Sequence, residues 1–150
     1  PRANRCRKLD GAINPKSLHM VWSIAPVLGT KNVANAVEYY REKLGFQNAN
    51  GIFRPEGHEA DGVYAVMTRD EIDLHIQIRR RELYPDARER IESDVYLYVE
   101  DVDLLFTEFD ERGAKIVRSI TDGPNYGLRD FVIEDLDQNR LIFGSPITSE

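Results

Sequence analysis

Polar and aromatic side chains alternate with apolar ones in two stretches of this 150-residue chain. An alternation of period two is typical of a strand with one face against a core and the other face turned away from it. The outward rows are Asp73, His75 and Gln77 in the first stretch, and Asp94, Tyr96 and Tyr98 in the second. Imidazole and carboxylate groups can ligate a metal or hydrogen-bond a ligand, and tyrosine rings can stack on one. The residues alone also allow His75 to be a structural side chain and Tyr96 to be interface packing.

Three further residues are candidates for a site. Trp22 begins the first predicted strand, where it could stack on a ligand, fill the site itself or pack under the preceding residues. Arg129 and Asp130 are adjacent on a later predicted strand, so their side chains point to opposite faces. One of the two side chains is expected to face away from the core, toward a ligand. A cross-strand ion pair that involves these residues is an equally good interpretation.

The elements that would position these residues form an internal repeat. Residues 24–44 align with residues 93–113 at an offset of 69. The aligned pairs include Leu28 with Leu97, Asn32 with Asp101, Val33 with Val102, Val37 with Phe106, and Tyr40 with Phe109. Each copy predicts a strand, an N-cap residue and an amphipathic helix, followed by a hairpin-like pair of strands. A repeated βαβββ unit predicts an α+β fold whose two half-sheets can hold a ligand between them.

The length suits one domain made of two similar halves. The expected segments are an N-terminal tail (1–21), module one (22–79), a charged connector (80–93), module two (94–146) and a C-terminal tail (147–150). Module one is predicted to open with a strand over residues 22–29, at a sheet edge or a bulge because Pro26 cannot donate a ladder hydrogen bond. In module two, Gly, Pro and Asn predict a loop over residues 119–127.

Composition excludes several classes of protein. The chain is 41% hydrophobic and 31% charged, as in soluble globular proteins, and has no apolar run near the ~20 residues of a membrane span. A single cysteine excludes an internal disulfide. The net charge of −6 disfavours nonspecific nucleic-acid binding. With no secretory signal, we expect a cytoplasmic protein that binds neither nucleic acid nor membrane.

Motifs of common catalytic sites do not occur in the sequence. It has no nucleophile elbow, phosphate-binding loop, zinc-protease motif or dinucleotide fingerprint. Glu134, Asp135 and Asp137 form an acidic turn, but their spacing is not that of a calcium loop. We expect this turn to be solvated.

Residues 126–144, YGLRDFVIEDLDQNRLIFG, resemble the vicinal oxygen chelate superfamily. This superfamily includes glyoxalase I, extradiol dioxygenases, fosfomycin-resistance enzymes and bleomycin-resistance proteins. Residues 135–139 read Asp-Leu-Asp-Gln-Asn where the family has Asp-Pro-Asp-Gly-Asn. The resemblance covers about residues 22–146. It implies two βαβββ modules that form a curved, mixed, partly open barrel.

Metal enzymes of this superfamily hold one divalent ion through a residue on the first and on the last strand of each module. The matching positions here are Ala25, His75, Asp94 and Ile142. Since Ala25 and Ile142 cannot ligate, only His75 and Asp94 remain as weak candidates. The resemblance therefore implies no cofactor, with a single Zn, Ni, Mn or Fe ion as the alternative.

The run Tyr126, Gly127, Arg129, Asp130 and Phe131 is similar to the Tyr-Gly-x-Arg-(Asp/Glu)-Phe pattern of bleomycin-resistance proteins. This resemblance implies a homodimer that binds or sequesters a small organic molecule without a metal, as antibiotic-resistance proteins do, and implies no catalytic residues. The implied groove is lined by Trp22, Asp73, His75, Gln77, Asp94, Tyr96, Tyr98 and Arg129. The alternatives are a metal-dependent lyase, isomerase or dioxygenase of the glyoxalase type, and a structural domain whose own side chains fill the cup.

Overall fold

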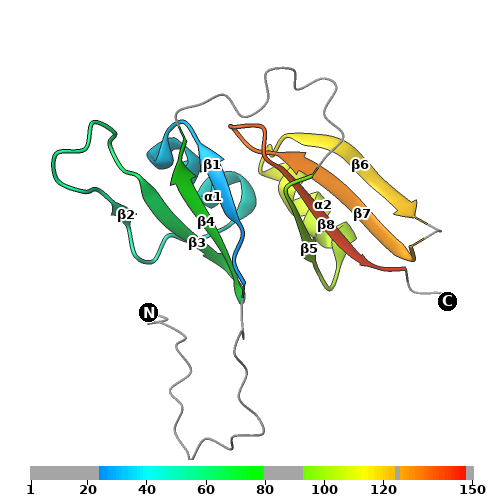
Figure 1. Ribbon diagram of the computed structural model, residues 1–150. Coiled ribbons are helices and arrows are strands. Elements are labelled where there is room, and N and C mark those ends of the chain that lie inside the picture. The colour runs from blue at the N-terminus through cyan, green and yellow to red at the C-terminus, as the bar shows by residue number, and fades with distance from the viewer. Residues whose placement is uncertain (1–23, 80–92, 124–125, 148–150) are drawn as a thin grey trace, which may run out of the picture.

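The computed structural model describes residues 24–79, 93–123 and 126–147 (Figure 1). Module one contains β1 (Val27–Thr30), α1 (Val33–Leu44), β2 (Ile52–Phe53), β3 (Tyr64–Arg69) and β4 (Ile72–Ile78). Module two contains β5 (Val95–Tyr98), α2 (Val102–Glu111), β6 (Ile116–Gly123), β7 (Leu128–Glu134) and β8 (Arg140–Pro146). The sheets have the equivalent orders β1-β4-β3-β2 and β5-β8-β7-β6, each with one parallel pair. This confirms the α+β class and the two repeated βαβββ modules of a barrel that is not closed.

Both predicted helix caps are present. The side chain of Asn32 accepts a hydrogen bond from the N–H of Asn35 at 2.9 Å, and Asp101 accepts one from Leu104 at the same distance. These bonds satisfy N–H groups that have no partner inside the first turn of a helix. Helix α1 ends before Gly45, which takes the left-handed conformation at φ 67° that glycine adopts without strain. None of the described helices is long and apolar enough to cross a membrane.

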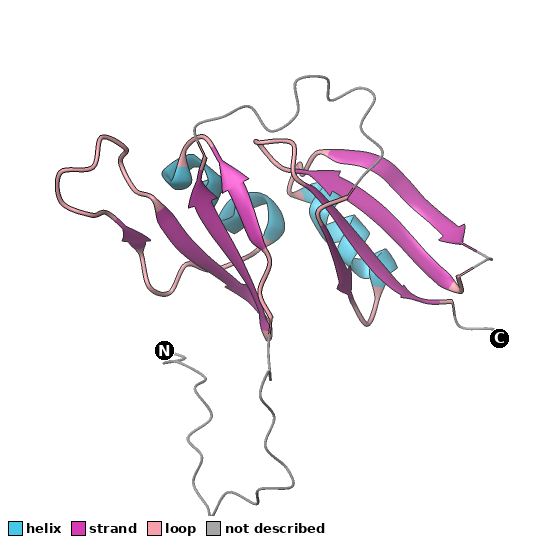
Figure 2. Ribbon diagram, viewed as in Figure 1, coloured by secondary structure: helices cyan, strands magenta, loops and turns pink. Residues whose placement is uncertain are grey.

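Each helix covers one face of its own sheet (Figure 2). The apolar strand rows and the buried helix residues form one hydrophobic cluster that includes both modules. Its fully buried large side chains include Tyr40, Leu44, Met67, Leu74, Ile76, Phe109, Phe131, Ile133 and Leu141. Burying each aliphatic or phenylalanine side chain contributes roughly 1.5–3 kcal/mol. The uncovered face of each sheet is called its open face below.

The turn of the first hairpin reaches the helix of module two. Arg69 Nη2 lies 2.6 Å from Glu108 Oε2, and the Arg69 guanidinium lies 5.6 Å from the centre of the Phe109 ring. Arg69 Nη1 also donates to the carbonyl of Leu44 at the end of α1. One arginine therefore connects both helices.

The turn of the second hairpin reaches α1 in the equivalent way. Tyr39 Oη donates to the Glu134 carbonyl at 3.0 Å, and Tyr40 Oη donates to Asp135 Oδ2 at 2.8 Å. Under the repeat offset of 69, Tyr39 and Tyr40 correspond to Glu108 and Phe109. Each hairpin turn thus contacts the same two helix positions of the other module.

Burial of the acidic turn corrects one sequence-based expectation. Glu134 and Asp135 are only 4% and 6% exposed, so the prediction that they are solvated is wrong. Glu134 pairs with Lys115 and Arg140, and the four hydrogen bonds that Asp135 accepts include the one from Tyr40. The charges can be buried because the other module, the neighbouring strands and the turn itself supply their partners.

Two predicted segments also differ in their bounds. The first strand begins at Val27 rather than residue 22, and Ile24 is 88% exposed. Pro26 precedes this edge strand, and its carbonyl accepts from the His75 N–H. Strand β6 continues to Gly123 through part of the predicted loop, because Thr121 pairs with Asp130 after a register irregularity. The N-terminal tail and nearly all of the connector lie outside the described residues.

Candidate functional site

The open face of sheet one carries the first predicted row. Asp73, His75 and Gln77 alternate along β4 with buried Leu74 and Ile76. The Oη of Tyr64 lies 2.6 Å from His75 Nδ1, and the rings meet edge to face at a centroid distance of 5.5 Å. Thr68 Oγ1 donates to Asp73 Oδ1 at 2.8 Å. This face therefore presents a line of polar groups, two of which are oriented by β3.

The open face of sheet two carries the two tyrosines of the second row. The rings of Tyr96 and Tyr98 have centroids 5.0 Å apart. Tyr98 is 74% exposed. Tyr96 Oη donates to Asp130 Oδ2 at 3.0 Å. Burial, followed by this hydrogen bond and the negative charge of Asp130, raises the pKa of the Tyr96 phenol, so it remains a neutral donor.

Two glycines give the tyrosines room to lie close to the sheet. A Cβ at Gly144 would come within 2.1 Å of Tyr96 Oη, and a Cβ at Gly123 would come within 1.9 Å of the Tyr126 ring. Tyr126 is 56% exposed, and it is among the groups that raise the Tyr96 pKa. We call Tyr96, Tyr98 and Tyr126 the tyrosine surface. It offers flat aromatic area on which a planar group can stack.

Asp130 is not an open anionic site. Its carboxylate is almost fully buried, and its Oδ1 lies 2.5 Å from Arg118 Nη2. Arg118 Nη1 also donates to the Asp130 carbonyl at 3.3 Å. The arginine offsets the charge of the carboxylate, which leaves Asp130 to orient Tyr96.

Arg129 lies on the opposite face of β7. Its guanidinium pairs with Asp103 of α2 at 2.9 Å and with Asp122 of β6 at 2.7 Å. Hydrogen bonds that Arg129 donates to the two carboxylates raise its pKa. The contacts are those of the cross-strand ion pair, and a ligand-binding role for Arg129 stays a prediction.

The remaining predicted residues lie elsewhere. Asp94 Oδ2 accepts from the N–H of Arg140 at 2.7 Å, where β5 and β8 begin to pair. Trp22 lies outside the described residues. The structure therefore groups Asp73, His75 and Gln77 on one open face, and Tyr96 and Tyr98 on the other.

Within one copy of the chain, the described residues do not form a site for a divalent metal. Among them, no group of three or more His, Cys, Asp and Glu side chains could hold an ion. Of the four family positions, Ile142 is paired with Tyr96, and Ala25 has no donor atom. The other two are His75, with Nδ1 bonded to Tyr64, and Asp94, with Oδ2 bonded to the backbone.

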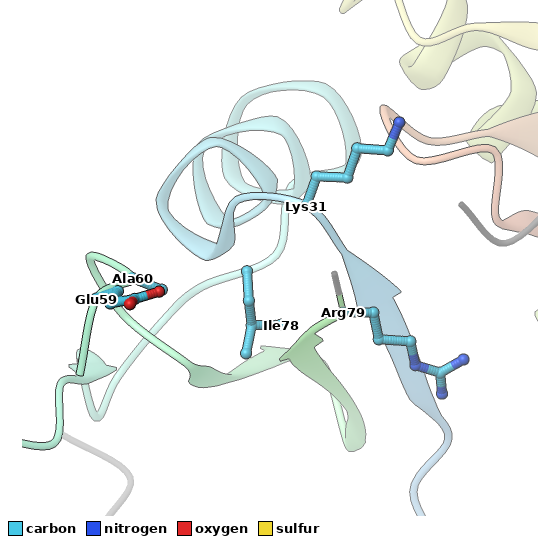
Figure 3. A pocket seen from close by; sticks show the side chains of 5 residues that line it. All are labelled: Lys31, Glu59, Ala60, Ile78 and Arg79. Carbon is cyan, nitrogen blue, oxygen red and sulfur yellow. The ribbon is translucent and has the colours of Figure 1, made fainter. Parts of the chain in front are cut away.

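A surface depression of about 390 Å³ lies apart from both rows, at the ends of β1 and β4 (Figure 3). Its lining residues are Lys31, Glu59, Ala60, Ile78 and Arg79. The side chains of Lys31 and Arg79 extend in different directions and do not converge on one point. We assign it no ligand.

Sequence reasoning missed Tyr64, Arg118 and Gly144. The short turn at Asp70 and Glu71 fixes the β3–β4 register, in which Tyr64 pairs with Gln77 and Val66 with His75. This turn could have placed Tyr64 on the open face beside His75. No sequence signal identifies Arg118, because an irregular pairing of β6 with β7 sets its position.

The family model for the Glyoxalase/Bleomycin resistance protein/Dioxygenase superfamily matches residues 18–143. No curated protein sequence matches the chain. A bleomycin-binding protein from bleomycin-producing Streptomyces verticillus, solved with copper(II)-bleomycin, is 22% identical, with 87% of this chain and 100% of that chain covered and a TM-score of 0.66. A glyoxalase-related enzyme from Clostridium phytofermentans is also 22% identical, with 86% and 98% covered and a TM-score of 0.67. The bleomycin resistance determinant encoded on transposon Tn5 is 16% identical, with 85% and 100% covered and a TM-score of 0.63. At these identities the likeness shows the fold.

Proposed function

The chain belongs to the Glyoxalase/Bleomycin resistance protein/Dioxygenase superfamily, and from this premise we propose that it binds a small organic molecule without a metal. The observation that carries the proposal is the tyrosine surface. Two of its three rings lie against glycines, and Tyr96 is held by buried Asp130. A rigid aromatic wall binds a planar ligand at a small cost in side-chain entropy.

The open face of sheet one supplies the polar complement. Asp73 offers a carboxylate, Gln77 an amide and His75 a ring nitrogen. Small-molecule sites commonly combine aromatic walls with a few oriented polar groups. The bleomycin-binding relative, which was solved with its drug, supports a ligand of this size.

We propose that a second copy of the chain completes the cup. The helix-covered faces share one core, so the open face of each sheet lies on the far side of that sheet from the core. Val27 and Tyr98 remain exposed there, at 40% and 74%. A homodimer that sets sheet one of one copy against sheet two of the other would cover both residues and close the site.

The test combines metal analysis with ligand binding. Purified protein is analysed for metal, and binding of metal-free bleomycin, copper(II)-bleomycin and further aromatic antibiotics is measured by calorimetry. We expect binding without stoichiometric metal, and about a fivefold or greater loss of affinity in Tyr96→Ala, since stacking contributes roughly 1 kcal/mol or more. Leu104→Ala, which removes an exposed apolar side chain on α2 away from both open faces, is the control.

The rival hypothesis is a metal-dependent enzyme of the glyoxalase type. It predicts one metal per chain in the wild-type protein and its loss in His75→Ala. That pair of results would overturn the proposal.

A further inference from the structure

We infer that Tyr64 fixes His75 as a hydrogen-bond donor toward the open face of sheet one, so that the ligand places an uncharged acceptor there. This uncharged acceptor on the ligand is a carbonyl oxygen or a ring nitrogen. The inference about the ligand rests on the proposed function, whereas the state of His75 does not. Tyr64 acts here as a positioning residue.

The geometry identifies which group donates. Tyr64 and His75 are diagonal neighbours on adjacent strands, since Val66 is the direct partner of His75. The 2.6 Å separation of Tyr64 Oη and His75 Nδ1 falls in the range of bonds donated by O–H, whereas bonds donated by N–H centre near ~2.9 Å. The edge-to-face rings, at an interplanar angle of 82°, bring the phenol to the edge of the imidazole. The phenol therefore donates to Nδ1.

This bond determines what the other ring nitrogen presents. A neutral imidazole carries one hydrogen, and a filled acceptor site at Nδ1 leaves that hydrogen on Nε2. In the protonated ring both nitrogens carry hydrogens, and Nδ1 would donate to the phenol oxygen instead. Nε2 is a donor in both forms. A metal ion at Nε2 would require the opposite tautomer, with Tyr64 as acceptor.

The surroundings of His75 favour an uncharged acceptor. Val66 of β3 and Val27 of β1 are its direct partners on the two sides. Along β4, Asp73 and Gln77 lie on the same face, and Thr68 orients the Asp73 carboxylate. A carboxylate ligand would meet the negative charge of Asp73 beside two apolar side chains. A carbonyl oxygen or ring nitrogen on an otherwise apolar ligand carries no net charge, so Asp73 would not repel it as it would a carboxylate.

The first experiment reads the tautomer in ligand-free protein, by long-range proton–nitrogen NMR on protein labelled at its three histidines. His75→Gln assigns the His75 signals. We expect hydrogen on Nε2 in the wild-type protein, and an altered Nδ1 shift in Tyr64→Phe because the donor is lost. Thr68→Val, which removes the neighbouring hydroxyl, should leave His75 unchanged. Hydrogen on Nδ1 in the wild-type protein would overturn the assignment, and thermal unfolding verifies that each variant is folded.

The second experiment tests the acceptor with acetophenone and benzoate, which share a ring and differ in charge. We expect acetophenone to move the His75 Nε2–H signal more than benzoate does at equal concentration. An equal or larger shift with benzoate contradicts the uncharged acceptor. The tautomer result stands separately, so failure of the proposed function and failure of this inference are distinguishable.

Discussion

Tyr40 Oη and Asp135 Oδ2 form a 2.8 Å hydrogen bond across the boundary between the two modules. Tyr40 is fully buried and Asp135 is 6% exposed. Besides Tyr40, Asp135 accepts from the N–H groups of Asp137 and Asn139 and from the Asn139 side chain. Burial raises the pKa of the Asp135 carboxyl to about 6, against these hydrogen bonds, which lower it.

Removing the Tyr40 hydroxyl should destabilise the whole domain. In Tyr40→Phe a buried carboxylate loses one of its donors, at a cost of about 1–3 kcal/mol. Urea denaturation measures the change in the free energy of unfolding. Tyr39→Phe is the control, because Tyr39 is half-buried and bonds only backbone groups, and its effect should be smaller. Equal losses would argue against the carboxylate as the cause.

The raised pKa of Asp135 predicts a stability contribution that falls with rising pH. The carboxyl titrates at 3.8 ordinarily and at about 6 in the folded protein, so between these values the folded state binds more protons. The stabilisation is fully present below pH ~4 and is lost as the pH rises through ~6, by on the order of 3 kcal/mol. The difference in unfolding free energy between wild type and Asp135→Asn, measured from pH 4 to 7, separates the contribution of Asp135 from those of Glu134 and Glu108. The pKa values of these two groups are lowered, so their contributions are lost as pH falls. A constant difference would contradict the prediction.

The two equivalent contacts between modules should respond differently to salt. Glu108→Gln removes the charge that pairs with Arg69 and, at the end of α2, with Arg112, and each of these partly exposed pairs contributes about 1 kcal/mol or less. Salt should reduce this effect because it screens exposed charges. The effect of Tyr40→Phe should be the same at low and high salt, since the pair is buried. Unfolding in urea at two ionic strengths tests both, and a salt-independent Glu108→Gln effect would count against the ion pair.

Gly144→Ala should displace Tyr96 from the sheet. The new methyl group would overlap Tyr96 Oη, so the ring must move and its bond to Asp130 must break. We expect a destabilisation of roughly 1–3 kcal/mol and weaker binding of any ligand that stacks on the tyrosine surface. Thermal unfolding and calorimetry measure the two effects. Ile142→Val, on the same strand and face, is the control for a general disturbance of β8.

Local patterns in the sequence predict the elements and the faces of β4 and β5. Asn32, Asp101 and Gly45 define helix ends through bonds within a few residues, so no knowledge of the rest of the fold is needed. The alternation around His75 and Tyr96 likewise depends on the strand itself. These signals give the repeat, and with it the fold.

Burial of charged groups could not be predicted because it depends on the other module or on an irregular strand pairing. Asp135 lies in a turn of acidic and polar residues that is typical of a solvated surface, and contacts with module one, among them the bond from Tyr40 95 residues earlier, make it part of the interior. Asp130 is similar, since its partner Arg118 is placed by an irregular strand pairing. The sequence therefore predicts which side chains of β4 and β5 share an open face, but it does not predict the face of Arg129 or the partners of the buried charges.

The two reciprocal turn–helix contacts make the halves of this chain complementary to each other and not to themselves. Two copies of module one joined in the same way would place Arg69 against Tyr39 and Tyr40, with no carboxylate at the Glu108 position. Two copies of module two would place Asp135 against Phe109, which has no hydroxyl to donate. Either homotypic pairing leaves a charge without its partner in the interface, and the cost is larger for Asp135, which is buried, than for the partly exposed Arg69. If the chain were cut in the connector, the fragments should therefore reassemble as a heterodimer, each half selecting the other over its own kind.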